Sequence, residues 1–418
     1  MRNMNDPHKN TLSLIFVTIF IDLIGFGMLI PVVPTLLANP ESPFFLLSIN
    51  TPVEQGYILI GLLTGLYFFG QFISTPILGD LSDKYGRKKI IMLSIIGSMF
   101  SFILFAIGIF AKSITLLFIA RGLNGFTSGI VSVSQAAITD FTPPHLRSKN
   151  FGVIGAAYGI GFIIGPFLGG VLSNPELVSW FAPSTPFLFA AFLAFLNFLS
   201  VYYFLPETNL SRTTAPLRWS QSIKNIISAY GMKEIRPLIV TNFFYNAGFA
   251  FFTTFLGVFL IVKFGFNQSA IGYYFAFVGV CMAISQTVIL PRVVKRFAEA
   301  KVFNVAILAT ALFTLAHLTV SVWWGLLLIV PFFAVANGLA NVTITVLVSQ
   351  SVRKEVQGQI LGINTSVNAL ALMIPSLFGG FVAASISPES PVLFGGLLIF
   401  VAWVIFVVFW KGHRTPVN

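Results

Sequence analysis

The chain has 418 residues, of which 56% are hydrophobic and only 9% are charged, and its formal net charge is +11. Soluble domains carry about 25% charged residues, so the composition excludes an ordinary soluble protein and indicates an integral membrane protein. The apolar runs are long enough for transmembrane helices rather than barrel strands. The basic residues lie in short segments beside these runs, which makes them signals of membrane topology rather than a surface for nucleic acid.

Twelve apolar runs are predicted to be membrane-spanning helices, because about 20 helical residues cross a hydrocarbon core of roughly 30 Å. In chain order they cover residues 12–37, 56–78, 90–111, 113–138, 150–172, 185–205, 236–262, 270–291, 301–320, 322–348, 358–384 and 391–410. The first run is too long for the apolar part of a signal peptide, so we expect no cleaved leader.

The positions of the 24 Lys and Arg residues predict the orientation of these helices. If both termini are cytoplasmic, 21 of the 24 fall on inner segments, two (Lys112 and Lys263) fall outside, and Arg121 lies within a span. Because positive residues favour the cytoplasmic side of a membrane, we predict a multi-pass protein with both termini inside.

The longest inner connection divides the chain into two halves of six spans. We expect a helical bundle over residues 1–205, a cytoplasmic linker over 206–235 and a second bundle over 236–418. A faint repeat at an offset of 210 residues supports this division: Gly152, Gly169 and Gly170 match Gly362, Gly379 and Gly380. Two repeated halves are the usual plan of secondary transporters, whose substrate site lies between the halves near the bilayer midplane.

Two formally charged side chains are predicted to lie deep in the spans. Asp22 is about 15 Å from the inner end of the first helix, and Arg121 is about 12 Å from the outer end of the fourth. Placing either charge there costs at least about 2.5–3.5 kcal/mol, which predicts a function for both. Asp22 would take up and release a proton, while Arg121 would adjust its proton affinity or bind anionic substrate groups. The alternative is a structural ion pair that joins two helices.

The stretch from Gly79 to Lys89 places six charged residues between two apolar runs and is interpreted as a cytoplasmic hairpin loop bracketed by glycines. Asp83 and Arg87 are four residues apart and can pair, and Asp140 at the inner end of the fourth span is a further partner for Arg87. Such contacts would close the cytoplasmic side and break when it opens. The alternative is that these charges only determine topology.

The fifth span contains closely spaced small residues and a proline, among them Gly161, Gly165, Pro166 and Gly169. Small residues at intervals of four let helices approach closely, and proline bends a helix. We interpret this stretch as a packing hinge and not as a phosphate-binding loop, because no lysine of the P-loop type follows it.

Several uncharged polar and aromatic residues within the spans are candidates for a substrate cavity: Gln71, Gln135, Phe243, Tyr245, Asn246 and Asn337. Hydrogen bonding between helices explains each polar one equally well. His317, near the outer end of the ninth span, is interpreted as a hydrogen-bonded histidine rather than a proton shuttle. The sequence shows no grouping of catalytic, metal-binding or nucleotide-binding residues, so we expect no enzyme, no metal and no cofactor.

Four stretches resemble known motifs. Gly79-x-Leu81-Ser82-Asp83-Lys84-x-Gly86-Arg87-Lys88-Lys89 is similar to the signature between spans two and three of the major facilitator superfamily. Three others resemble the twelve-span drug:proton antiporters that include the tetracycline exporters: Asp22-x-x-Gly25-x-Gly27-(x)3-Pro31-x-x-Pro34, Arg121-Gly122-x-x-Gly125 and Gly165-Pro166.

The resemblance implies an all-α integral membrane fold of twelve transmembrane helices in two pseudo-symmetric six-helix bundles. It also implies that Asp22 is the membrane-embedded acid, that Arg121 takes part in proton coupling, and that Asp83, Arg87 and Asp140 form a cytoplasmic charge relay. The acids associated with tetracycline–metal export in spans three and nine are not evident here, which argues against tetracycline as the substrate.

These observations together predict a proton-coupled antiporter of a bacterial inner membrane that exports small amphiphilic or apolar compounds by alternating access. The expected partners are a small-molecule substrate, protons and the lipid bilayer, with no nucleic acid, and a monomer is expected to form a complete pathway. One alternative is an exporter or proton symporter of an endogenous metabolite such as a siderophore or nutrient. A membrane-embedded enzyme or sensor would need a catalytic cluster or a soluble domain.

Overall fold

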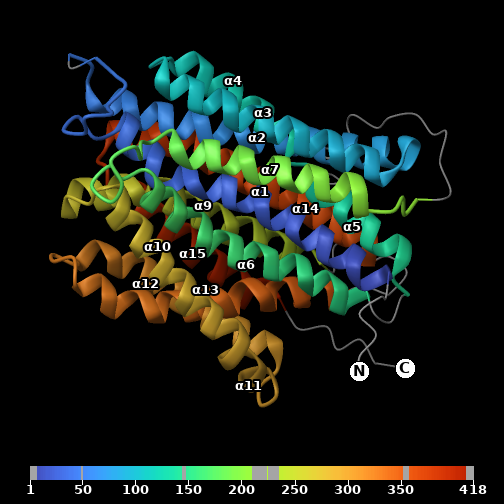
Figure 1. Ribbon diagram of the computed structural model, residues 1–418. Helices are drawn as coiled ribbons and strands as arrows, with labels where there is room; N and C mark the ends of the chain where they lie inside the picture. The colour runs from blue at the N-terminus through green and yellow to red at the C-terminus, as the bar shows by residue number, and fades with distance from the viewer. Residues whose placement is uncertain are drawn as a thin grey trace. The chain divides into compact units, whose positions relative to one another are not determined.

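The computed structural model describes residues 7–48, 50–143, 147–209, 224, 235–351 and 357–410, and these residues contain helices and no strand (Figure 1). Among these residues, seven helices precede the predicted linker: α1 (Pro7–Leu37), α2 (Val53–Tyr85), α3 (Arg87–Phe110), α4 (Ile114–Thr127), α5 (Ile130–Phe141), α6 (Arg147–Leu172) and α7 (Thr185–Phe204). The helices after the linker are α9 (Arg236–Phe264), α10 (Gln268–Ile284), η2 (Ser285–Ile289), α11 (Leu290–Val294), α12 (Glu299–Thr319), α13 (Gly325–Gln350), α14 (Gln357–Ser385) and α15 (Ser390–Phe409).

Each of the twelve predicted spans coincides with one helix or with a run of consecutive helices. Among the described residues, 11 helical segments are long and apolar enough to cross a membrane, with Ile114–Phe141 and Gln268–Val294 counted as continuous segments. The fifth predicted span corresponds to α6, in which Gly159–Leu172 is a shorter apolar helix. The prediction of an all-helical membrane protein is confirmed.

The helix ends follow local sequence signals. Pro186, Pro237 and Pro391 occupy the first turns of α7, α9 and α15, where a missing N–H leaves no helical hydrogen bond unmade. Gly265 ends α9 in the left-handed conformation, with φ 66°. Ser113 caps α4 because its Oγ accepts a hydrogen bond from the Leu116 N–H at 3.4 Å.

The charged stretch after Gly79 is helical, so its interpretation as a hairpin loop bracketed by two glycines is wrong. The helix α2 continues to Tyr85 and α3 begins at Arg87, which leaves Gly86 alone between them. Gly86 has φ 103°, a conformation that other residues rarely adopt, so one glycine produces the whole reversal. Gly79 lies inside α2, where an added Cβ would meet only Ser132 Oγ at 4.0 Å.

Two spans predicted as continuous are interrupted. The fourth divides into α4 and α5 at Ser128 and Gly129. Here Ser128 Oγ donates a hydrogen bond to the Gly125 carbonyl at 2.7 Å, a local bond that competes with the helical pattern. The eighth contains the π-helical turn η2, in which Ser285 Oγ donates to the Val335 carbonyl of α13 at 3.0 Å. Turns of this kind are frequent at functional sites.

The described helices form two compact units. Unit 1 comprises Met1–Val33, Leu66–Gln221 and Gln268–Tyr273, and unit 2 comprises Pro34–Gly65, Ser222–Asn267 and Tyr274–Asn418, in both cases as far as these ranges are described. The core of unit 1 includes Ile19, Ile95 and Val133, and that of unit 2 includes Tyr245, Phe303 and Ile344. Of the predicted linker, residues 210–223 and 225–234 lie outside the described part of the chain.

Candidate functional site

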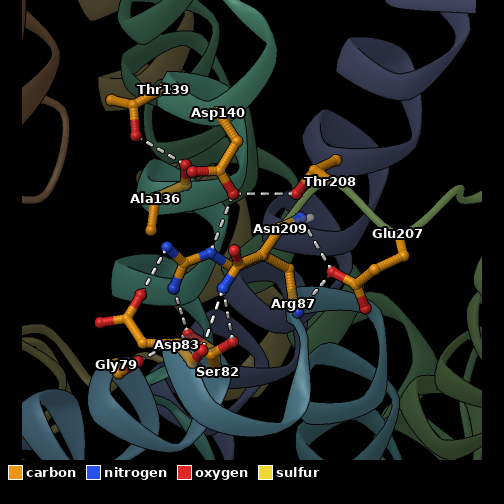
Figure 2. Close-up of polar contacts among 10 residues, drawn as sticks. All are labelled: Gly79, Ser82, Asp83, Arg87, Ala136, Thr139, Asp140, Glu207, Thr208 and Asn209. Carbon is orange, nitrogen blue, oxygen red and sulfur yellow. Dashed lines mark hydrogen bonds and ion pairs between the residues drawn. The ribbon is translucent and has the colours of Figure 1, made fainter. Parts of the chain in front are cut away.

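Arg87 is the centre of a polar cluster in unit 1, at the junction of α2 and α3 (Figure 2). Its side chain is buried, and its guanidinium contacts three groups: Asp83 Oδ1 at 2.6 Å, Asp140 Oδ2 at 3.0 Å and Ser82 Oγ at 2.6 Å. Because Asp83 lies on α2 and Asp140 on α5, the guanidinium joins two helices through charge-assisted hydrogen bonds. The structure therefore brings together the three charged residues among the five predicted for a cytoplasmic gate, which also include Gly79 and Gly86.

The first residues after α7 complete this cluster, and the sequence analysis missed them. Glu207 Oε1 accepts a hydrogen bond from the Arg87 backbone N–H at 2.8 Å, so its carboxylate caps the amino end of α3. Thr208 Oγ1 donates to Asp140 Oδ2 at 3.1 Å, and Asn209 Nδ2 donates to the Asp83 carbonyl at 3.1 Å. An added Cβ at Gly86 would meet the Glu207 carboxylate, which is the movable end of a side chain, so glycine is required here by its φ of 103°. We call the residues 82, 83, 87, 140 and 207–209 the Arg87 cluster.

Asp22 lies on α1 among hydroxyl groups. Ser98 Oγ of α3 donates a hydrogen bond to Asp22 Oδ1 at 3.3 Å, and the same hydroxyl lies 3.0 Å from Thr127 Oγ1 of α4. Three helices of unit 1 therefore meet at this carboxyl group. Hydroxyl groups can form a hydrogen bond with a carboxyl group in either protonation state, because each hydroxyl can donate or accept.

Arg121 is held by aromatic rings and an amide instead of an acid. Its side chain is 3% exposed, and the guanidinium carbon lies 4.4 Å from the Tyr67 ring centroid and 5.5 Å from that of Phe26. Nη1 donates to Asn124 Oδ1 at 3.3 Å, whereas Nε has no hydrogen-bond partner. Within the described part of the chain, Asp22 and Arg121 form no ion pair, so the structural salt bridge considered as an alternative is absent.

A small cavity of about 10 Å³ lies against Arg121, and its other walls are mainly aromatic and aliphatic. It is lined by Leu29, Ser101, Phe102, Phe105, Ala120, Arg121, Asn124 and Phe187. This volume is near the minimum that admits one water molecule. The polar part of the wall consists of Ser101, Asn124 and the guanidinium itself.

The predicted hinge glycines of α6 pack on α1 within unit 1. An added Cβ on Gly165 would lie 2.8 Å from the Gly27 Cα, and one on Gly161 would lie 2.7 Å from the Leu23 Cβ. A Cβ on Gly169 would lie 2.8 Å from the Met28 Cα, while Pro166 is inside the helix. The two backbones approach so closely that only glycine fits, as at the interfaces of membrane helices in general.

The predicted cavity residues belong to both units. Gln71 on α2 and Gln135 on α5 belong to unit 1, and each is half-buried. In unit 2, Tyr245 of α9 donates from its hydroxyl to Asn337 Oδ1 of α13 at 2.5 Å, and both side chains are 1% exposed. Phe243 packs edge-on against Phe244 beside the core of that unit.

Asn246 belongs instead to a cluster of four asparagines that the sequence analysis did not recognise. Asn242 and Asn246 lie on α9, and Asn364 and Asn368 lie on α14. Asn242 Nδ2 donates to Asn364 Oδ1 at 2.8 Å and to Asn368 Oδ1 at 2.7 Å. The signal in the sequence is the same spacing of four residues in both helices, which places each pair on one helix face. We call these four residues the amide cluster.

His317 is fully buried in unit 2, and both ring nitrogens have partners. Nδ1 lies 2.7 Å from the Phe313 carbonyl and therefore donates to it, which leaves Nε2 to accept from the Tyr274 hydroxyl at 2.8 Å. The rings of Phe252 and Phe333 lie edge-on to the imidazole. No group of three His, Cys, Asp or Glu side chains suited to a metal ion occurs among the residues that the structure describes.

Comparisons with known proteins agree with this architecture. The sequence-family model of the Major Facilitator Superfamily matches residues 15–375 of this chain. The chain is 27% identical to the class H tetracycline resistance protein of Pasteurella multocida, over 98% of each chain. It is 24% identical to multidrug resistance protein 2 of Bacillus subtilis (strain 168), over 99% of this chain and 98% of that one. The crystal structure of the human organic anion transporter MFSD10 superposes with a TM-score of 0.72 and 21% identity, covering 96% of this chain and 100% of that one.

Proposed function

Because the chain belongs to the Major Facilitator Superfamily, we propose that it is a proton-coupled antiporter that exports a small amphiphilic or apolar compound by alternating access. It is a multi-pass membrane transporter and not an enzyme. Among its relatives are proteins named for resistance to tetracycline and to multiple drugs, which supports export of a foreign compound. The chemistry of Asp22 and Arg121 supports coupling to protons.

The observation that carries the proposal is the absence of a direct ion pair at Asp22 in the described part of the chain, where Arg121 interacts with its carboxyl group only electrostatically at longer range. Its carboxyl group contacts the Ser98 hydroxyl and forms no salt bridge within the described chain, so a proton can bind without first displacing a partner. A charged carboxylate deep in the membrane costs at least about 2.5–3.5 kcal/mol, and protonation removes that cost. Proton binding therefore alters the stability of any conformation in which Asp22 is shielded from water.

Arg121 would act as a fixed positive charge in the same unit. Its guanidinium is held by the Tyr67 and Phe26 rings, which attract a cation without neutralising it. A cation retained in this way favours the charged form of Asp22 through space once the proton has left. The two groups would then work in sequence, with the arginine stationary and the acid changing charge.

The Arg87 cluster would be the cytoplasmic gate. Its ion pairs join α2 to α5, and Glu207 and Asn209 tie the start of the linker to the same point. We propose that these contacts persist while the cytoplasmic side is closed and break when it opens.

The remaining parts of the proposal concern the membrane, the oligomeric state and the domains. We propose a monomer in a bacterial inner membrane with both termini inside. Its helical bundles would cover residues 1–205 and 236–418, joined by the linker 206–235.

Proton flux measured in proteoliposomes tests the proposal. The wild-type protein, Asp22→Asn or Asp22→Glu is reconstituted into vesicles that contain a pH-sensitive dye. Drugs, siderophores and metabolites from a panel are then added one at a time. We expect substrate-dependent proton flux in the wild type, none in Asp22→Asn, and partial flux in Asp22→Glu, which keeps the ionisable group. Equal thermal stability of the three proteins is the control for folding.

Three results would contradict the proposal or its assignment of coupling to Asp22. Substrate movement without proton flux would indicate a uniporter or a different coupling ion. Proton and substrate moving in the same direction would indicate a symporter of a nutrient, which is the alternative considered from the sequence. Full proton-coupled activity in Asp22→Asn would remove Asp22 from the mechanism while leaving the family assignment intact.

A further inference from the structure

The amide cluster lies at the depth of a substrate site. Asn246 is about 15 Å along α9 from Arg236, and Asn368 is about 16 Å along α14 from Gln357. Both helices belong to unit 2, and the two asparagines on each are four residues apart. Asn242 and Asn364 are 3% and 7% exposed, whereas Asn246 and Asn368 are each half-buried. The cluster therefore has a buried side and an accessible side.

The hydrogen bonds within the cluster leave several polar atoms unused. Both hydrogens of Asn242 Nδ2 go to Asn364 and Asn368, and Asn246 Nδ2 donates to Asn242 Oδ1 at 2.8 Å. The amide nitrogens of Asn364 and Asn368 and the amide oxygen of Asn246 have no hydrogen-bond partner in the described part of the chain. Two donor groups and one acceptor thus remain at the cluster.

A purely structural link between helices does not need these unused atoms. The nearby contact between Tyr245 and Asn337 shows the difference, since the Tyr245 hydroxyl reaches both the Oδ1 and the carbonyl of Asn337 and joins α9 to α13 through residues that are each 1% exposed. The amide cluster uses four side chains where two would join the helices. The unused amide atoms are not among the fully buried unpaired side-chain atoms of the described chain, so they remain accessible to a ligand that can pair with them.

The charge of the surroundings limits the chemistry of that ligand. No Asp, Glu, Lys or Arg occurs in α13 or α14, and in α9 these residue types occur only near the ends, at Arg236 and Lys263. An ionic group placed at the cluster would therefore lack a counter-charge on these helices. Carbonyl and hydroxyl oxygens, by contrast, match two amide donors and one amide acceptor without any desolvated charge.

We propose that the amide cluster is a recognition subsite for an uncharged part of the cargo that carries a carbonyl oxygen and a hydroxyl group. This inference rests on the proposed function as an exporter and adds the class of substrate to it. The asparagine amides of α14 donate to the cargo oxygen, and Asn246 Oδ1 accepts from the cargo hydroxyl. Cargo without such groups leaves these amides desolvated and unpaired, so a site of this kind rejects it.

Equilibrium binding to the purified full-length protein in lipid nanodiscs tests the subsite. The probes are chloramphenicol, which is uncharged and carries hydroxyl and amide groups, its diacetyl ester, in which both hydroxyls are blocked, and tetraphenylphosphonium, a cation without hydrogen-bonding groups. The variants are Asn246→Ala and Asn368→Ala. The control is Asn304→Ala, which removes an amide of unit 2 that accepts from Trp403 Nε1 at 2.8 Å outside the cluster.

We expect chloramphenicol to bind wild type about tenfold more tightly than its diacetyl ester does, because one hydrogen bond to a buried partner changes affinity by about that factor. Asn246→Ala should abolish this preference. Asn368→Ala should lower the affinity for chloramphenicol about tenfold, whereas Asn304→Ala should leave that affinity unchanged. Asp22→Asn should also keep this binding while it loses proton flux, so the subsite and the proposed antiport can fail independently.

The inference is overturned if chloramphenicol binds no better than its ester. It is also overturned if tetraphenylphosphonium binds more tightly than chloramphenicol, or if the cluster variants lose thermal stability with no change in the ratio of affinities. The last result would identify the four asparagines as a link between α9 and α14 alone. Asn368→Gln provides a second variant that keeps the amide if Asn368→Ala does not fold.

Discussion

The Arg87 cluster and the amide cluster both join helices through polar side chains, but they differ in charge and in completeness. In the Arg87 cluster, the guanidinium has acidic or hydroxyl partners on two helices. The segment after α7 adds a carboxylate that accepts a hydrogen bond from the Arg87 backbone N–H. In the amide cluster, all members are neutral and three amide groups retain unused atoms. A closed network of charges is suited to holding one conformation, whereas an open neutral network is suited to binding a ligand.

The same contrast extends to the two units. The formally charged side chains deep in the described spans, Asp22 and Arg121, both belong to unit 1. Deep within the described spans of unit 2 the polar groups are uncharged, with the amide cluster as the main example. We infer that proton coupling and recognition of the cargo are divided between the units. Four substitutions test the roles that we assign to residues of the two units, in order of expected effect.

Arg121→Gln should give the largest effect, because it removes the only cation that lies deep in the described spans of unit 1. We expect transport to fall to the level of empty vesicles while the free energy of unfolding changes by no more than about 2 kcal/mol, the scale of a desolvated cation–π contact. Asn124→Ala removes only the 3.3 Å hydrogen bond to the same guanidinium and is the control. Undiminished proton-coupled transport in Arg121→Gln would show that the cation is structural.

Arg87→Ala should mainly lower stability. The change leaves Asp83 and Asp140 without their shared cation, and breaking a buried pair costs about 3–5 kcal/mol. Because the Asp83 side chain is 38% exposed, we expect about 2–3 kcal/mol here. Denaturant unfolding measures the loss, and thiol labelling of cysteines placed on the cytoplasmic side measures opening.

The control for this change is Arg292→Ala, since Arg292 is exposed and its guanidinium donates to the Val288 carbonyl within its own helical segment. Arg87→Lys is the conservative variant, because lysine keeps the charge and loses the planar fork that reaches three partners. If Arg87→Ala left cytoplasmic labelling unchanged, the cluster would be a topology signal without a gating role.

Tyr274→Phe tests the neutral histidine of unit 2. Removal of the hydroxyl leaves His317 Nε2 buried without its donor, which should cost about 1–3 kcal/mol of stability. The pH profile of transport should stay as in the wild type, because we assign proton coupling to unit 1. Tyr273→Phe is the matched control, since Tyr273 is 51% exposed. A shifted pH profile in Tyr274→Phe would place His317 in the proton pathway.

Glu207→Ala should give the smallest effect. Loss of the carboxylate that caps α3 should cost about 1 kcal/mol, as for other helix caps, and should increase thiol labelling on the cytoplasmic side. Glu176→Ala removes an exposed acid elsewhere in unit 1 and should change neither quantity. Equal behaviour of the two variants would mean that the segment after α7 does not contribute to the gate.

The amino-acid sequence by itself determined the membrane class and the approximate ends of the spans, because crossing lipid requires about 20 consecutive apolar residues whatever lies beside them. It also identified Asp22 and Arg121, since a charge within an apolar run is conspicuous without any structural information. Gly86 shows the limit of local reasoning. A glycine between charged residues predicted a loop, yet only one residue departs from helical structure.

Only the tertiary structure decided which side chains meet. Glu207 follows Arg87 by 120 residues, and the asparagines of α9 and α14 are 122 residues apart, so no helical or strand period relates them. The sequence could not show that Asp22 and Arg121 stay unpaired, because opposite charges at similar depth predict a salt bridge equally well. Such pairings depend on the distance and rotation between packed helices. These are determined by close backbone contacts, such as that of Gly165 with Gly27, which act between segments far apart in the chain.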